Sequence, residues 1–266
     1  MVNTPIEIIH AAARNAPAGS LDDRVYLNQL MNLSEFALPS SNKCIYVDVP
    51  LNKIVALCRD DFWSEGETWR DVTFRIIGNG WPHEVFDYFE SALEEKGFPA
   101  PSSQYELRLK SVGGVCECIN GNHRLVAGRA WLAEKYHEKA HLKKVKLSSY
   151  AVHPEIADFL RSAIARGVGI RAATSGPANW RHLRVQDRPV NMLLTMADEP
   201  HKEFAWIDGK LVSLKDSRNF LQKMFPNCFL LFKDKYSWRE IPPSIVAGLI
   251  DDEWLLPQLV SARSWD

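Results

Sequence analysis

The chain has 266 residues, and 46% of them are hydrophobic, as expected of a globular protein that buries a sizeable core. Its formal net charge of −1 excludes the strongly basic proteins whose main work is to coat nucleic acid. Five cysteines without CxxC spacing and without a preceding signal peptide favour a reducing, cytoplasmic setting. No apolar run is long enough to span a bilayer, so we expect no membrane partner.

The first part of the chain has the apolar spacing of two helices. Apolar residues recur at helical intervals over Pro5–Asn15 and again over Leu21–Phe36, and Pro17-Ala-Gly19 separates the two stretches. We therefore interpret residues 1–42 as an N-terminal helical extension.

The middle of the chain alternates between strand and helix patterns. Residues 43–57 are rich in β-branched side chains and are interrupted by Pro50, which predicts an edge strand followed by a turn. The patterns that follow predict, in chain order, a helix over 67–80, an amphipathic helix over 83–96, strands over 105–112 and 115–119 joined at Gly113-Gly114, a helix over 122–137 and a strand over 145–152.

Residues 153–266 form a C-terminal region without a recognisable motif or helix-turn-helix. The patterns predict a helix over 154–165, a polar segment rich in glycine and arginine over 167–187, an apolar run over 190–197, a hairpin at Asp208-Gly209 and a helix over 214–225. The arginines of this region suit either a polyanion or an interdomain surface.

The segment Asn120-Gly-Asn-His-Arg124 predicts a tight turn that leads from a strand directly into a helix. The start of a helix offers unpaired N–H groups and a positive dipole end, both of which attract anions. Gly121 lets a ligand approach the backbone closely, and the forked guanidinium of Arg124 suits phosphate. We therefore predict a phosphate-binding turn formed by Gly121, Asn122, His123 and Arg124.

The sequence Ile119-Asn-Gly-Asn-His-Arg-Leu-Val-Ala127 resembles the D/N-G-x-H-R-x-x-A signature of the ParB/sulfiredoxin-like superfamily. Upstream, Val47-Asp-Val-Pro-Leu-Asn-Lys-Ile54 resembles the opening strand of ParB-like domains. The resemblance covers residues 43–152 and implies an α+β fold, with a small mixed sheet and the motif helix packed on it. A C-terminal α/β extension of unassigned fold, residues 153–266, follows. The helix at 83–96 departs from the family pattern as an insertion.

The resemblance implies a protein that binds ATP or CTP with Mg²⁺ and cleaves or transfers a phosphoryl group, with His123 and Arg124 on the phosphates. Phosphoryl transfer also needs a metal clamp or a carboxylate to orient the acceptor. We select Glu67 and Asp71 as catalytic candidates with His123, because the two acids lie one helical turn apart and can share a ligand. Asn122 stands where the sulfiredoxin branch has its reactive cysteine, so sulfinic-acid reductase chemistry is not expected.

Two other functions remain open on the sequence. ParB relatives include DNA-binding clamps and nucleases, although near-neutral charge and the lack of a visible helix-turn-helix count against a clamp. A catalytically inactive interaction module of plasmid or phage origin is the third alternative.

Two further patterns resemble metal or redox motifs. His137-Glu-Lys-Ala-His141 has the H-E-x-x-H spacing of zinc hydrolases, but its lysine-rich surroundings and its place at a helix end favour a surface role, and we expect no zinc. Cys116 and Cys118 share one face of a strand, and we interpret them as small buried residues.

Overall fold

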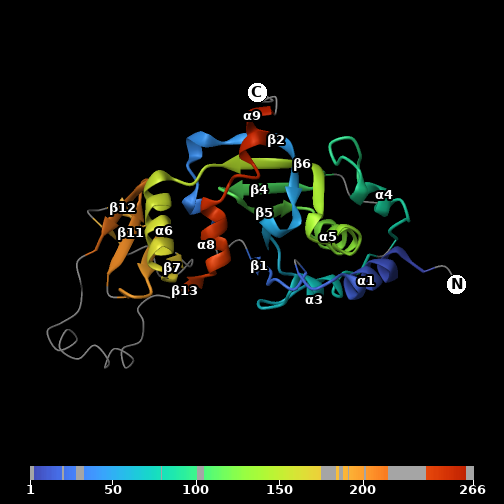
Figure 1. Ribbon diagram of the computed structural model, residues 1–266, viewed down its shortest axis with the longest axis horizontal. Helices are drawn as coiled ribbons and strands as arrows, with labels where there is room; N and C mark the ends of the chain where they lie inside the picture. Colours follow the sequence, from blue (N-terminus) through green and yellow to red (C-terminus); the bar gives the residue numbers. More distant parts are fainter. Residues whose placement is uncertain are drawn as a thin grey trace. The chain divides into compact units, whose positions relative to one another are not determined.

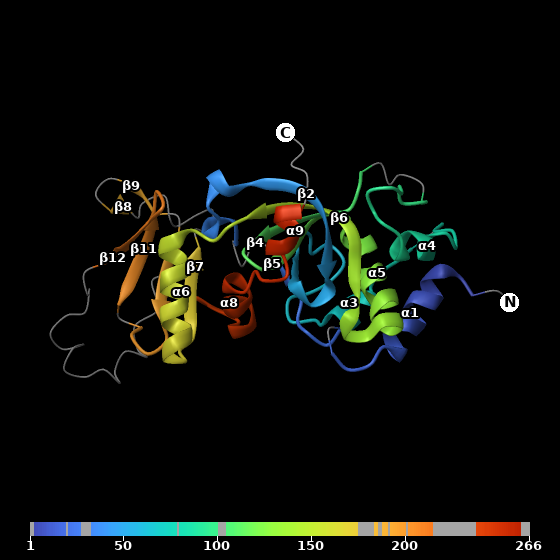
Figure 2. The same cartoon turned by 45° about the horizontal axis from the view of Figure 1, so that its top comes forward.

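The protein, seen here in a computed structural model, is described for residues 3–19, 21–27, 33–78, 80–100, 105–174, 184–185, 188–190, 192–200, 202–214 and 238–261 (Figures 1 and 2). It is an α+β protein, which confirms the predicted class. The chain forms two compact units. The first comprises Met1–Met31, Pro39–Ala151 and Asp251–Asp266, and the second comprises Asn32–Leu38 and Val152–Ile250.

The first unit contains a six-stranded mixed sheet in the order β1-β3-β5-β4-β6-β2. Its strands are β1 (Tyr26–Leu27), β2 (Lys43–Pro50), β3 (Ile54–Leu57), β4 (Arg108–Val112), β5 (Val115–Asn120) and β6 (His141–Tyr150). The neighbours β1, β3 and β5 run parallel to one another, with Leu57 paired to both Leu27 and Cys118. Their carboxyl ends therefore meet at one edge of the sheet, where α/β sheets commonly bind ligands.

Helices of the first unit gather around α5 (Asn122–Tyr136), which packs against α1 (Pro5–Asn15), α3 (Trp69–Thr73) and α4 (Val85–Glu90). Figures 1 and 2 both show α1 beside α5. The buried face of α5 includes Leu125 and Val126, which belong to one apolar core with Cys116 and Cys118 of β5. Both thiols are fully buried, as the sequence predicted. Among the described residues no helix has both the length and the apolar character to cross a membrane.

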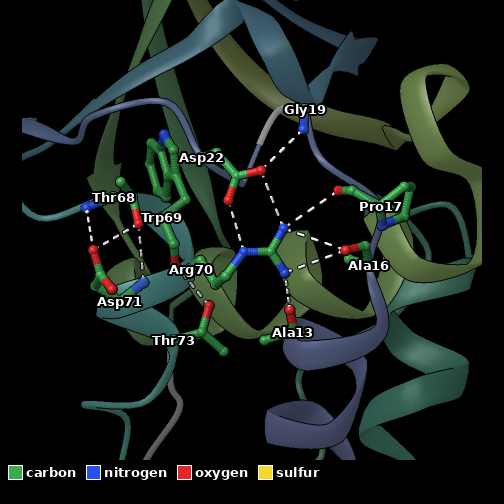
Figure 3. A network of polar contacts seen from close by, with 10 residues as sticks. All are labelled: Ala13, Ala16, Pro17, Gly19, Asp22, Thr68, Trp69, Arg70, Asp71 and Thr73. Atoms are coloured by element: carbon green, nitrogen blue, oxygen red, sulfur yellow. Dashed lines mark hydrogen bonds and ion pairs between the residues drawn. The ribbon is translucent and has the colours of Figure 1, made fainter.

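Arg70 of α3 ties this helix to the C-terminal end of α1 (Figure 3). Its Nε donates to Asp22 Oδ1 at 2.7 Å, and its Nη2 donates to Asp22 Oδ2 at 3.2 Å. Its Nη groups also donate to the backbone carbonyls of Ala13, Ala16 and Pro17. These carbonyls lie at the negative end of the helix dipole, so a cation there stabilises the packing of α1.

The last helix, α9 (Leu256–Ser261), belongs to the first unit. One of its side chains forms hydrogen bonds to the edge strand β2 at a point where the pairing of that strand is irregular. The register of β2 against β6 shifts between Val47 and Val49. Asp48 lies at this shift, and its N–H donates to Gln258 Oε1 at 2.8 Å while its carbonyl accepts from Gln258 Nε2 at 2.9 Å. The Gln258 side chain therefore supplies the partners that the β6 ladder does not.

The second unit has a five-stranded sheet in the order β12-β11-β10-β7-β13, with every neighbouring pair antiparallel. Its strands are β7 (Ile170–Thr174), β10 (Met192–Met196), β11 (Glu203–Ile207), β12 (Lys210–Ser213) and β13 (Arg239–Ile241); β8 (Arg184–Val185) and β9 (Arg188–Pro189) pair separately. Helix α6 (Pro154–Arg166) packs against α8 (Pro243–Ile250).

Several predicted elements are confirmed. The helices over 5–15, 122–137 and 154–165, the edge position of β2 and the two hairpins appear as expected. The polar segment at 167–187 contains the strand β7, and the predicted helix at 214–225 lies almost entirely outside the described residues. The resemblance to the ParB/sulfiredoxin-like fold stays a prediction.

The predicted helix over Leu21–Phe36 is wrong. Residues 26–27 form strand β1, and residues 33–36 form a 3-10 turn. Val25 N–H donates to the carbonyl of Glu67, and Arg70 N–H donates to that of Leu21, so the backbone of this segment pairs with a distant part of the chain. Such tertiary hydrogen bonds override apolar spacing that also fits a helix.

The predicted helices over 67–80 and 83–96 form only in part, as the short helices α3 and α4. Helix α4 ends at Ser91 because the next residues pair with the sheet: Ala92 bridges to Lys143, and Leu93 N–H donates to the Lys143 carbonyl at 2.9 Å. The amphipathic pattern beyond residue 91 therefore reflects packing in a bridge and turn rather than in a helix, and the turn is closed by Glu95 N–H, which donates to the Ala92 carbonyl.

Candidate anion-binding site

The turn between β5 and α5 leaves the first N–H groups of the helix without a side-chain cap. Gly121 occupies the N-cap position with φ 90° and ψ 34°, a left-handed conformation that favours glycine. Glycine has no side chain to accept hydrogen bonds from the first helical turn, and the structure shows no side-chain cap there. Asn120 fixes the turn from outside, because its Nδ2 donates to the Glu106 carbonyl at 2.6 Å.

Arg124 folds back over this turn. The side chain is 8% exposed, and a Cβ added to Gly121 would lie 3.0 Å from Arg124 Nη2 and 3.1 Å from Nε. The guanidinium carbon lies 5.4 Å from the ring centre of Phe98. Within the described part of the chain, the buried Nη1 of Arg124 has no hydrogen-bond partner. A buried donor without a partner costs about 1–3 kcal/mol, so its retention points to a ligand.

The electrostatics of the first turn of α5 point the same way. Arg124 places a cation at the positive end of the helix dipole, where anions are stabilised and cations are not. The first turn contains no acidic residue to offset this charge. An anion bound at the turn would receive both the free N–H groups and the guanidinium fork. The arrangement is therefore unfavourable when empty and complementary to a phosphate.

The segment after β3 lies beside this turn because β3 and β5 are parallel neighbours. Cys58 is in contact with Asn122, whose Nδ2 is 3.4 Å from the sulfur. The rings of Phe62 and His123 lie 4.2 Å apart between centroids. Burial lowers the pKa of His123, while the nearby charge of Asp61 acts to raise it. His123 is therefore mainly neutral at neutral pH and available as a proton acceptor.

Helix α4 and the segment after it form the inner wall of the site. Tyr88 is 3% exposed, and its ring packs edge-on against Phe98 at 5.0 Å between centroids. Burial raises the pKa of the Tyr88 phenol, and the guanidinium of Arg124 acts in the opposite direction. The phenol therefore stays protonated, and the segment predicted as an insertion contributes aromatic walls to Arg124.

The structure brings together the four predicted turn residues and gives the two predicted acids other partners. Asp71 forms a capping box with Thr68, whose backbone N–H donates to the carboxylate at 3.0 Å. Glu67 accepts from Ser64 N–H at 2.9 Å and pairs with Arg75 at 2.7 Å. Both carboxylates serve local structure around α3, and their catalytic role stays a prediction.

The contact of α3 with α5 lies further along the helix. There the fully buried Arg129 stacks over the Trp69 ring at 4.1 Å and donates from Nη1 to the Ile54 carbonyl at 2.8 Å. Burial lowers the pKa of Arg129 to about 9, so this guanidinium remains cationic at neutral pH. An aromatic face and a backbone carbonyl are therefore partners of this guanidinium.

Sequence reasoning missed four residues of this site. Cys58 and Phe62 follow a strand parallel to β5, so a correct pairing of β3 with β5 would have placed them beside the turn. Tyr88 and Phe98 lie on a segment whose approach to Arg124 is set by tertiary packing, and no sequence signal marks them.

Two segments contain side chains of the kinds that ligate metals. The segment His137-Glu-Lys-Ala-His141 forms a 3-10 turn followed by the start of β6, so it does not place two imidazoles on one helix face. Among the described residues no group of three or more histidine, cysteine, aspartate or glutamate side chains could hold a metal ion. Mg²⁺ that arrives with nucleotide phosphates needs only one or two carboxylates, and Asp60 and Asp61 follow β3 at this edge.

Comparison with models of protein families, with curated proteins and with solved structures found no match. The interpretation of this site therefore depends on its own geometry.

Proposed function

We propose that the protein binds a nucleotide, ATP or CTP, with its phosphates at the N-terminus of α5, and that it cleaves or transfers a phosphoryl group. The observation that carries the proposal is the buried Arg124, whose Nη1 lacks a hydrogen-bond partner among the described residues. A guanidinium in the first turn of a helix, where that turn contains no acidic residue, is complemented by an anion.

The proposal gives each turn residue a role. The backbone N–H groups that follow Gly121 hold phosphate oxygens, and Arg124 binds the same group through its planar fork. Donors fixed before the reaction stabilise the charge that develops on the phosphoryl group. His123, held neutral by burial, accepts the proton of the attacking water or hydroxyl. Mg²⁺ bound to the phosphates supplies further charge neutralisation.

The test is binding and turnover of ATP and CTP with Mg²⁺, measured by calorimetry and by phosphate release. We expect Arg124→Ala to weaken nucleotide affinity about 100-fold, because a buried charged hydrogen-bond pair is lost. Arg14→Ala is the matched control, since it removes an exposed arginine from the last turn of α1 in the same unit.

Two outcomes would contradict the proposal. Wild-type protein with no affinity at millimolar nucleotide would remove its basis. Affinity for duplex DNA that falls steeply with salt, with no response to nucleotide, would favour the DNA-binding alternative.

A further inference from the structure

Tyr88 is a buried polar side chain that the predicted phosphate turn does not explain. It comes from α4, 36 positions before Arg124 in the chain, and its residue is 3% exposed. Its ring meets Phe89 and Phe98 in edge-on contacts at 5.8 and 5.0 Å between centroids. A phenylalanine would make these aromatic contacts equally well, so the ring packing alone does not account for the hydroxyl.

The same phenylalanine connects Tyr88 to the anion-binding turn. Phe98 packs against the Tyr88 ring on one side and carries the Arg124 guanidinium carbon 5.4 Å from its ring centre. Burial raises the pKa of the Tyr88 phenol, and the guanidinium of Arg124 acts to lower it through its charge and through a hydrogen bond to the phenol. Tyr88 and Arg124 thus converge on one aromatic side chain, although they come from different helices.

We propose that Tyr88 is a further ligand-binding residue, whose hydroxyl donates a hydrogen bond to an oxygen of the phosphate held by Arg124. The inference rests on the proposed phosphate-binding function of the α5 turn. The Tyr88 hydroxyl would add a neutral hydrogen-bond donor to the Arg124 guanidinium and to the backbone N–H groups of the turn. A cradle made only of donors suits a fully deprotonated oxyanion.

The burial of the two side chains also selects the kind of phosphate. Arg124 and Tyr88 are both more than nine-tenths buried. A phosphodiester inside a nucleic-acid strand carries a sugar on each side and cannot bring its oxygens to donors at this depth. A terminal phosphate has three free oxygens and can enter end-on. The site is therefore specific for terminal phosphates over internal phosphodiesters.

The experiment compares wild type, Tyr88→Phe and the control Tyr136→Phe, which removes the hydroxyl of an exposed tyrosine in the same unit. Calorimetry measures the affinity of each protein for pyrophosphate, for ATP and for dimethyl phosphate as a model phosphodiester. We expect Tyr88→Phe to weaken pyrophosphate and ATP binding at least 10-fold, Tyr136→Phe to change nothing, and dimethyl phosphate to bind at least 100-fold more weakly than pyrophosphate.

A spectroscopic measurement separates ligand contact from a structural effect. Pyrophosphate added to wild type changes the environment of the Tyr88 phenol, so we expect a tyrosine difference spectrum in the ultraviolet that Tyr88→Phe abolishes. Equal pyrophosphate affinity in wild type and Tyr88→Phe would overturn the inference and leave the proposed function intact. Absence of pyrophosphate and ATP binding to wild type would instead overturn both the inference and the proposed function, so the two failures give different results.

Discussion

Arg70 and Arg124 lie at opposite kinds of helix end in the same unit. Arg70 lies at the C-terminal end of α1, where backbone carbonyls and Asp22 accept its hydrogen bonds (Figure 3). Arg124 lies in the first turn of α5, at the positive end of that helix, with a buried nitrogen that has no partner in the described structure. The first arrangement is complete without a ligand, and the second requires one.

Replacing each arginine by methionine should give the largest difference between the two sites, because we expect opposite changes in the free energy of unfolding. We expect Arg70→Met to lower the free energy of unfolding by about 2 kcal/mol, because Asp22 and the carbonyls at the end of α1 lose a partly exposed partner. We expect Arg124→Met to raise it by about 1 kcal/mol, since an apolar side chain of similar volume replaces a buried cation without a carboxylate partner. Urea denaturation monitored by tryptophan fluorescence measures both. A similar loss of unfolding free energy in the two variants would show that Arg124, like Arg70, has its partners without a ligand.

Gly121 offers a smaller perturbation of the same site. Gly121→Ala forces an L side chain into a left-handed conformation and brings its Cβ to 3.0 Å from Arg124 Nη2. We expect a loss of stability of about 1–2 kcal/mol and a weakening of nucleotide affinity of about 10-fold. Gly66→Ala is the control: its φ is 96° and no atom lies within 4 Å of the added Cβ. If Gly121→Ala loses more stability than Gly66→Ala but both bind nucleotide with the same affinity, the position of Arg124 does not depend on the space left by the missing Cβ of Gly121.

Asp71 tests whether the acids selected from the sequence act in catalysis or in structure. We expect Asp71→Ala to lower stability by about 1 kcal/mol through loss of the capping box with Thr68. Backbone and side-chain hydrogen bonds from Thr68 lower the pKa of Asp71. Its contribution is therefore present above the ordinary aspartate pKa and is lost as the pH falls through the lower folded value. Turnover abolished in Asp71→Asn at unchanged stability would support the catalytic role.

His123 should give the smallest effect. Burial lowers its pKa, so the unfolded chain binds its proton more readily than the folded protein does. Stability is therefore full above the unfolded pKa near 6.5 and decreases as the pH falls through the folded value. Because His123 is only partly buried and water screens its charge, we expect this loss to be under about 1 kcal/mol. Unfolding at pH 7.5 and pH 5 should show a smaller difference in His123→Asn than in wild type. An equal pH dependence in both proteins would contradict the assignment.

The sequence predicted those parts of the site whose structure depends on residues that are close together in the chain. The Asn120-Gly121 turn and the following helix depend on neighbours in sequence, and both formed as expected. The segment at 21–36 was misassigned because its hydrogen bonds go to residues more than 40 positions away, such as Glu67 and Arg70. Tyr88 was missed for the same reason, since its relation to Arg124 exists only once α4 packs against α5.

The most direct test of the central claim is the effect of nucleotide on the stability of wild type and Arg124→Met. A ligand that binds only the folded state adds about 2.7 kcal/mol to the free energy of unfolding at 100 times its dissociation constant. With ATP and Mg²⁺ at that level, we expect wild type to gain this amount and Arg124→Met, with an affinity about 100-fold weaker, to gain only about 0.4 kcal/mol. An equal gain in both proteins, or none in wild type, would contradict the claim that Arg124 is completed by a phosphate.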